Sequence, residues 1–210
     1  MWYINKLDEP EEIVEWKRKF KKRFHRKPGY DDLDKESVLK DTLRTNLIKE
    51  QNGLCGYCCS SLIDNAVHIE HIRPRGKMEY AELSLDYNNL LASCIPKSKY
   101  DHCGHYKDNN FDEGLFISPY EKDCEDYFEY SEITGSVSGK DGNLKAEYMI
   151  KLLNLNENRL KRSRLEAIWT SEIMCMTTEE LQDYKVRLET GRDIVFADAQ
   201  LYVVKKLLNQ

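Results

Sequence analysis

Cysteine spacing constrains this chain of 210 residues more than any other feature. Cys55 and Cys58 form a Cys-x-x-Cys turn, and Cys94 and Cys103 follow as a second, more widely spaced pair. A Cys-x-x-Cys turn presents two sulfur atoms from one tight loop, and zinc prefers four sulfur or nitrogen ligands in a tetrahedron. We therefore predict a structural zinc site formed by these four cysteines, with Cys59 as the substitute ligand for the first pair.

The rest of the composition favours metal binding over disulfide bonds. The sequence has no apolar run long enough for a membrane span, and its N-terminal residues lack the apolar stretch of a signal peptide. We expect a cytoplasmic protein without membrane association. Because the cytoplasm keeps thiols reduced, a metal site explains the seven cysteines better than a disulfide framework does.

Charge is distributed unevenly along the chain. The net charge is −5, yet eight of the eleven residues from 17 to 27 are Lys or Arg, while the segment 112–132 is rich in acidic residues. This balance argues against a surface that is basic all over, but it permits one basic face. We predict that Lys21, Lys22 and Arg26 bind nucleic-acid phosphates, with an ordinary solvated helix face as the alternative.

Helical periodicity predicts an N-terminal helical region over residues 1–52. The first helix is expected to begin at an Asp8 cap and to carry a stripe of apolar side chains that faces the core, formed by Ile13, Trp16, Phe20 and Phe24. The second helix is expected over 35–51, with Gly53 as its C-terminal stop. It leads the chain directly into the first cysteine pair.

The C-terminal region, residues 113–210, is predicted to form a hairpin and then four helices. The hairpin turns at Gly135, and a capping box of Thr177 and Glu180 begins the third of these helices. The expected helices cover 144–153, 157–175, 178–190 and 196–208. The apolar stripe of the last helix completes the core or docks a partner. The predicted fold class is therefore α+β, mostly α.

A short segment between the cysteine pairs carries groups suited to phosphodiester hydrolysis. His68, Glu70 and His71 are expected on one strand that ends before Pro74. Hydrolysis needs a base that activates water and positive charge that neutralises the phosphate. Histidine titrates near neutral pH, and Mg²⁺ prefers oxygen ligands. We assign His71 as the general base and Glu70 as a ligand of a catalytic Mg²⁺ or Mn²⁺.

The order of these groups resembles the HNH endonuclease family. The shared features are a Cys-x-x-Cys turn, an acidic residue before His-Ile-x-Pro, an Asn-Leu pair, two further cysteines and a lysine. The resemblance implies a zinc-stapled ββα-metal core over residues 53–112, flanked by N-terminal and C-terminal helices. It also identifies Asn89, which precedes Leu90, as the residue that fixes the loop carrying the base.

The last metal ligand of the motif departs from the family pattern. In the family a His or Asn directly follows the last cysteine, whereas Gly104 occupies that position here. The resemblance therefore implies that His105, one residue further on, is the second catalytic metal ligand beside Glu70. His102 and Asn109 are the alternatives.

Three basic residues near the motif are expected to contact phosphate. Lys107 lies four residues after Cys103 and matches the lysine of the family. Arg73 and Arg75 flank Pro74 at the end of the predicted strand, where their side chains could reach a nucleic-acid backbone.

The similarity continues outside the motif. The segments 51–55, 115–119 and 152–159 and the hairpin at Gly135 resemble the HNH subunit of Septu-type anti-phage systems, some of which are associated with retrons. This resemblance implies a role in phage defence and a partner ATPase of the ABC or SMC-like kind. The C-terminal helices are the expected docking surface.

Two other functions share part of this pattern. A zinc-dependent deaminase shares the His-x-Glu pattern of His68 and Glu70, but its cysteine pair follows the glutamate, whereas Cys55 and Cys58 precede it. A non-catalytic zinc module that binds nucleic acid or protein explains the cysteines but leaves Glu70 and His71 without a role. For the endonuclease, DNA is the favoured substrate, and RNA, tRNA in particular, is the alternative.

Overall fold

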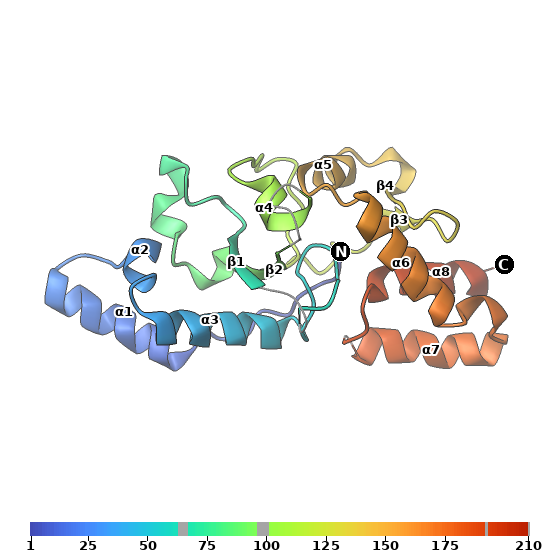
Figure 1. Cartoon of the computed structure of the whole chain (residues 1–210), viewed down its shortest axis with the longest axis horizontal. Coiled ribbons are helices and arrows are strands. Elements are labelled where there is room, and N and C mark those ends of the chain that lie inside the picture. The colour runs from blue at the N-terminus through green and yellow to red at the C-terminus, as the bar shows by residue number, and fades with distance from the viewer. Residues whose placement is uncertain (63–66, 96–100, 192, 210) are drawn as a thin grey trace.

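The computed structural model describes residues 1–62, 67–95, 101–191 and 193–209. They form a mostly helical α+β fold with two small antiparallel sheets (Figure 1). The α-helices are α1 (Glu11–Phe24), α2 (Tyr30–Leu33), α3 (Ser37–Glu50), α4 (Cys103–Lys107), α5 (Leu144–Leu152), α6 (Asn158–Thr170), α7 (Thr178–Gly191) and α8 (Ala197–Leu208). The 3-10 helices are η1 (Met78–Leu83), η2 (Tyr87–Asn89), η3 (Lys140–Gly142) and η4 (Ile173–Cys175). The strands are β1 (Val67–His71), β2 (Leu90–Cys94), β3 (Phe128–Tyr130) and β4 (Val137–Gly139).

Helix α1 begins later than predicted. Its N-cap is Pro10 rather than Asp8, and the cap makes no side-chain hydrogen bond. The amides of Ile13 and Val14 donate to the Pro10 carbonyl at 2.9 and 3.1 Å. Proline suits a helix start because its fixed φ matches the helix and its missing N–H has no partner to lose there. The prediction that Asp8 caps this helix was therefore wrong.

The apolar stripe of α1 leaves the core as the helix proceeds. Ile13 is fully buried, Trp16 and Phe20 are half-buried, and Phe24 is 50% exposed. Helical spacing places all four side chains on one face, but the protein covers that face only near its N-terminal end. The prediction that the whole stripe lies in the core was wrong for Phe24.

Helix α3 agrees closely with its predicted range. Leu43 and Leu47 are buried on the side that faces the sheet region. Gly53 follows the helix with a φ of 76°, in the left-handed region that glycine adopts without strain. Its amide donates to the Ile48 carbonyl at 2.9 Å, which ends the helix as predicted.

The central sheet pairs β1 with β2. The strands are antiparallel, with Val67 opposite Cys94 and His71 opposite Leu90. Helices α3 and α4 both contact the two strands. Every residue of β2 is buried, whereas β1 is half-buried at Val67 and His68 and buried from Ile69 to His71. The pair of β1 and β2 and the short helix α4 position the side chains of the site described below.

The C-terminal hairpin turns at Gly135 as predicted, and the turn depends on glycine. Gly135 has a φ of 66°, and a Cβ there would lie 2.0 Å from the Lys161 carbonyl oxygen of α6. Arg164, which is buried, donates to the carbonyls of Gly135 and Leu155. The hairpin is thus held tightly against α6.

The four predicted C-terminal helices are present, with one shorter than expected. Helix α6 ends at Thr170 because Glu172 takes a left-handed conformation with a φ of 58°, and η4 follows. The predicted capping box of Thr177 and Glu180 is formed before α7, with the two amides bonded at 2.7 and 3.3 Å.

Helix α8 completes the core through its apolar stripe. Leu201 and Val204 are buried. At its start, Asp198 accepts a hydrogen bond from Tyr130 at 2.6 Å and also pairs with the Met1 ammonium group. This contact joins the first residues of the chain to the C-terminal helices. No helix in the described parts of the chain is long and apolar enough to cross a membrane.

Candidate metal centre and adjoining pocket

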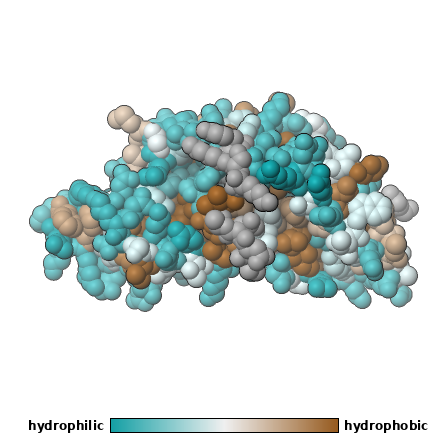
Figure 2. Space-filling model, in the orientation of Figure 1, coloured by the Kyte–Doolittle hydropathy of each residue, from teal (hydrophilic) through white to brown (hydrophobic). Residues whose placement is uncertain are grey.

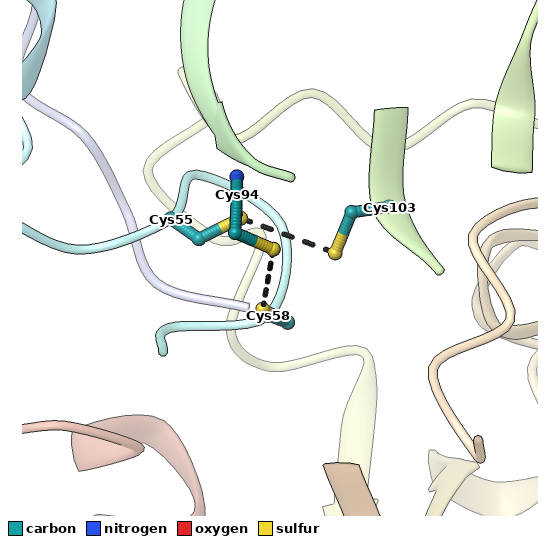
Figure 3. Close-up of side chains that lie close together, drawn as sticks. All are labelled: Cys55, Cys58, Cys94 and Cys103. Carbon is teal, nitrogen blue, oxygen red and sulfur yellow. Dashed lines mark hydrogen bonds between the residues drawn. The ribbon is translucent and has the colours of Figure 1, made fainter. Parts of the chain in front are cut away.

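Four buried thiols meet at one end of the central sheet. Cys55, Cys58, Cys94 and Cys103 place their sulfur atoms within 4.8 Å of one another (Figure 3). The sulfur atoms of Cys55 and Cys103 lie 3.9 Å apart, and those of Cys58 and Cys94 lie 3.8 Å apart. Four thiols at this spacing could hold a metal ion such as zinc, as the sequence predicts.

Backbone hydrogen bonds hold the first cysteine pair in place. The Cys55 amide donates to the Ser60 carbonyl at 2.8 Å, and the Gly56 amide donates to the Ala92 carbonyl of β2 at 3.0 Å. The Cys59 amide donates to the Cys55 carbonyl at 3.0 Å, which closes the turn. Cys59 itself lies outside the cluster, and burial raises the pKa of its thiol well above its ordinary value. Cys59 is therefore an ordinary buried thiol rather than a substitute ligand.

The charge state of the cluster suits a cation. Burial raises the pKa of Cys55, but hydrogen bonds from the other three thiols outweigh burial and hold that pKa well below its ordinary value. Burial and the neighbouring Cys55 raise the pKa of Cys103. The cluster thus favours one deprotonated thiol. Deprotonation of a second thiol is unfavourable unless a divalent cation neutralises the charge.

His102 faces the thiols rather than the pocket described below. Its Nδ1 atom lies 3.2 Å from the Cys103 sulfur and 3.7 Å from the Cys94 sulfur. A ring N–H at this place can donate to a thiolate and so orient a metal ligand. Of the candidates for the closing ligand of the catalytic site, His102 is thus the one that the structure places elsewhere.

A pocket of about 390 Å³ opens beside the thiol cluster. Its polar lining comes mainly from β1, α4 and the loops next to them. The lining includes Tyr30, His68, Glu70, His71, Arg75, Gly104, His105, Asp108 and Asn109. The structure therefore brings Glu70, His71 and His105, three of the residues assigned to the catalytic site from the sequence, into one pocket together with His68 and Tyr30.

The two carboxylate oxygens of Glu70 have different surroundings. Oε1 accepts a hydrogen bond from Lys107 at 2.9 Å and one from the Tyr57 hydroxyl at 3.4 Å. Oε2 lies 3.4 Å from Nε2 of His68. Burial raises the pKa of Glu70, but His68 and Lys107 outweigh burial and lower it below the ordinary value. Glu70 is therefore an ionised carboxylate anchored through one oxygen.

A side chain at residue 104 would require the Glu70 carboxylate to shift. A Cβ at residue 104 would lie 2.6 Å from Oε2 of Glu70. The Glu70 carboxylate thus lies where a side chain at residue 104 would begin. His105, the next residue, lies instead against His68, with ring centroids 4.8 Å apart in an edge-to-face arrangement.

The pocket is less complete than the thiol cluster as a metal site. Among the described residues, the four cysteines are the one group of three or more His, Cys, Asp or Glu side chains whose ligand atoms all lie within 4.8 Å of one another. Glu70 supplies a carboxylate, which suits Mg²⁺ or Mn²⁺, and His68 and His105 supply imidazoles, which suit transition-metal ions better than Mg²⁺. Their ligand atoms are not gathered as tightly as those of the four thiols.

His71 is held as a neutral imidazole. Its Nε2 atom lies 3.0 Å from the Ser84 carbonyl oxygen. Because a carbonyl can only accept, Nε2 carries the proton and Nδ1 keeps its lone pair. Burial lowers the pKa of His71 to about 4, despite the opposing effect of the Ser84 bond. Tyr30 packs edge-on against the ring at a centroid distance of 4.7 Å.

Asn89 ties together the two ends of the loop that follows β1. Its Oδ1 accepts from the Arg73 amide at 2.8 Å, and its Nδ2 donates to the carbonyls of Arg73 and Leu83 at 3.0 and 3.1 Å. The loop between these residues leads to Ser84, the partner of His71. Asn89 is buried and therefore fixes this loop from inside the protein.

Lys107 does not occupy the expected position. Its side chain is fully buried, and its ammonium group donates to Glu70 and to the His71 carbonyl, each at 2.9 Å. A buried carboxylate needs a counter-charge, and Lys107 supplies it for Glu70. In this buried position Lys107 does not face phosphate, in contrast to the prediction.

The arginines next to β1, half-buried Arg73 and exposed Arg75, are paired with acidic residues. Arg75 lines the pocket, lies over the Tyr30 ring and pairs with Asp31 at 2.7 Å. Arg73 pairs with Glu113, also at 2.7 Å. Exposed pairs of this kind are weak, so either arginine can exchange its partner for a phosphate.

The basic residues of α1 differ in their surroundings. Lys21 and Lys22 are exposed. Arg26 forms two hydrogen bonds with Asp32, at 2.7 and 2.9 Å. Arg26 thus links the end of α1 to α2, whose Tyr30 packs on His71.

Sequence reasoning gave no role to His68, Tyr30, Tyr57 or Ser84. Residues two apart on a strand face the same side, so the spacing of His68 and Glu70 was a signal that could have been used. Tyr30, Tyr57 and Ser84 reach the site through tertiary packing, and their positions in the sequence carry no comparable signal.

Comparisons with known proteins support the resemblance seen in the motifs, although no family model matches the chain. Septu protein PtuB of Bacillus mycoides (strain KBAB4) is 27% identical over 197 residues, which covers 81% of this chain. The Retron Vc95 putative HNH endonuclease of Vibrio cholerae serotype O1 biovar El Tor is 29% identical over 137 residues, which covers 62% of this chain. The chain spans 65% of the length of each relative. The predicted resemblance to HNH-type nuclease subunits of defence systems is confirmed.

Proposed function

We propose that this chain is a metal-dependent HNH endonuclease that hydrolyses phosphodiester bonds of nucleic acid in an anti-phage defence complex. The main support is one pocket that combines a neutral His71 with an ionised Glu70. The four-thiol cluster next to it and the names of the two similar proteins support the same function.

In this proposal β1, β2 and α4 form a ββα core within residues 53–112. The segments 1–52 and 113–210 are its helical flanks. Zinc bound by the four cysteines fixes the turn at Cys55, the end of β2 and the start of α4 relative to one another. Because α4 carries His105 and Lys107, this staple also positions one wall of the pocket.

His71 acts as the general base. Its Nδ1 lone pair accepts a proton from the attacking water, while Ser84 keeps the other ring nitrogen protonated and Tyr30 limits rotation of the ring. Asn89 serves this step indirectly, because it holds the loop that carries Ser84.

Glu70 and His105 hold the catalytic cation, with Asn109 as the alternative to His105. A bound Mg²⁺ or Mn²⁺ supplies positive charge to the scissile phosphate. Lys107 positions Glu70 by holding Oε1, which leaves Oε2 on the side of His68 and Gly104. Arg73, Arg75, Lys21, Lys22 and Arg26 bind substrate phosphates.

The protein acts with a partner ATPase of the ABC or SMC-like kind, which docks on the C-terminal helices. Large apolar side chains are exposed there, with Trp169 at 60%, Val186 at 58% and Met174 at 45%. Exposed apolar side chains of this size are common at protein interfaces. DNA is the favoured substrate and tRNA the alternative.

Cleavage of plasmid DNA and total tRNA tests the proposal. The purified chain is assayed with Mg²⁺ or Mn²⁺, alone and with its partner ATPase, beside the His71→Ala variant. His25→Asn is the matched control, because His25 is exposed, lies outside the pocket, and has a left-handed φ of 54° that asparagine tolerates.

The proposal predicts cleavage of one pool that His71→Ala abolishes and His25→Asn retains. Nucleic-acid binding without cleavage, with and without the ATPase, would favour the non-catalytic zinc module instead. Cleavage that survives His71→Ala would remove His71 as the base.

A further inference from the structure

The exposed end of α1 carries a ladder of aromatic rings. The Trp16 and Phe20 centroids lie 5.6 Å apart, and the Phe20 and Phe24 centroids lie 4.5 Å apart. Phe24, the last ring, is 50% exposed. Burial of a phenylalanine ring normally stabilises a fold, so an exposed ring at the end of such a ladder is available to a ligand.

Positive charge surrounds these rings. The Arg23 guanidinium lies 5.1 Å from the Phe24 centroid, and the Arg26 guanidinium lies 4.8 Å from the Phe20 centroid. Lys21 and Lys22 are exposed on the same turns of the helix. Within the described parts of the chain, neither lysine nor Arg23 has a carboxylate oxygen within 4.0 Å, so these cations can bind phosphate without breaking an ion pair.

The ladder lies on a surface that leads to the pocket. Arg26 pairs with Asp32 of α2, and Tyr30 of α2 packs against His71. In Figure 1, α2 lies between α1 and β1. The corresponding end of the molecule in Figure 2 is largely hydrophilic with a few apolar atoms among the polar ones. A strand bound at α1 can therefore continue past α2 to His71.

This combination selects one chemical class of ligand. An aromatic side chain can stack only on a base whose face is free. In a duplex, each base face is covered by the neighbouring base pair. A single strand offers free bases together with phosphates, and proteins bind it through aromatic rings inside a basic groove. A duplex could use the cations of α1 but not the Phe24 ring.

We propose that Phe20, Phe24, Lys21, Lys22 and Arg23, named here the aromatic-basic ladder, bind single-stranded nucleic acid. The bases of unpaired nucleotides stack on Phe24, and the neighbouring phosphates contact the lysines and Arg23. The inference rests on the proposed nuclease function and deepens it, because it gives the substrate an unpaired segment bound on α1, which α2 connects to the pocket. The binding itself does not depend on catalysis.

Equilibrium binding of two probes tests the ladder. Fluorescence anisotropy is measured on the full chain without added divalent cation, using a labelled oligothymidylate of about 20 nucleotides and a blunt duplex of the same length. Phe24→Ala is compared with Phe24→Tyr, which keeps the ring, and with Lys22→Ala. Thermal unfolding of each variant is recorded, and since Phe24 is half exposed only a small decrease in the unfolding temperature is expected.

Phe24→Ala is expected to weaken single-strand binding about tenfold and to leave duplex binding within about twofold, because one stacking contact is lost. Phe24→Tyr should bind like the wild type. Lys22→Ala should weaken both probes and reduce the salt dependence. Equal loss for both probes in Phe24→Ala, no loss at all, or a failure of Phe24→Tyr to retain affinity would overturn the inference.

Two further results separate this inference from other accounts. If Phe24→Ala binds the single strand normally but loses its partner ATPase, the ladder is a protein-docking surface and the inference is wrong. If the ladder binds the single strand as expected while His71→Ala still cleaves, the binding site stands and the proposed catalytic mechanism fails.

Discussion

The thiol cluster and the pocket lie close together on the same strand pair, yet they are built in opposite ways. The cluster consists of four identical ligands, all buried and close to one another. The pocket combines carboxylate, imidazole and guanidinium groups, and its central carboxylate is already paired with Lys107. Structural metal sites are closed and catalytic ones keep an open position, so this difference matches the structural and catalytic roles proposed for the two regions.

Loss of one thiol should have the largest effect. Cys55→Ser removes a ligand from the closed site, and structural zinc contributes on the order of 10 kcal/mol to the folding of small zinc domains. We expect the variant to lose zinc and to unfold at much lower urea concentration. Cys175→Ser, which changes an exposed thiol, is the control. A Cys55→Ser protein with full zinc content and unchanged unfolding would contradict the structural role.

Removing the counter-charge of Glu70 should have the next largest effect. Lys107→Met leaves a buried carboxylate without its partner, which should cost about 3–5 kcal/mol of the free energy of unfolding. The double variant Lys107→Met/Glu70→Gln removes the charge as well and should recover part of that loss. Urea unfolding measures both. Equal stability of the single and double variants would show that the ion pair does not hold this wall of the pocket.

The loop that carries Ser84 should depend on Asn89. Asn89→Ala leaves three partly buried backbone groups without partners, so we expect a loss of about 3 kcal/mol. Asn88→Ala, at the exposed neighbouring position, should have little effect. If both variants unfold alike, Asn89 is not what fixes the loop.

His71 should make stability depend on pH in a defined direction. Its pKa falls from 6.5 to about 4 on folding, so the unfolded chain binds a proton that the folded chain excludes. Stability should therefore fall as pH drops below 6.5 and stop falling below about 4. As pH drops from about 7.5 to 5.5, protonation of His71 in the unfolded chain should lower the free energy of unfolding by about 1 kcal/mol. His71→Gln should remove it, and an identical pH dependence in the variant would show that His71 titrates normally.

Much of this arrangement could be predicted from local patterns. The Cys-x-x-Cys turn, the strand before Pro74, the glycine stop of α3 and the capping box of α7 depend on neighbouring residues, so spacing alone indicates them. These features have short-range causes that a single sequence displays.

The errors have long-range causes. Phe24 continues the periodicity of Ile13, but the body of the protein ends before it, and periodicity carries no information about where a neighbour ends. Lys107 matches a motif position, yet its environment is set by Glu70, a residue 37 positions away. The fit between Gly104 and the Glu70 carboxylate is likewise visible only when strand and helix are brought together.

Binding of Mn²⁺ to zinc-loaded protein tests the separation of the two regions most directly. Mn²⁺ electron paramagnetic resonance and zinc content are measured together on the wild type and on Glu70→Gln. We predict that the wild type binds Mn²⁺ at a single site, and that Glu70→Gln weakens this binding by about tenfold or more while zinc content stays the same. Unchanged Mn²⁺ affinity in Glu70→Gln, or loss of zinc together with Mn²⁺, would contradict two sites with separate roles.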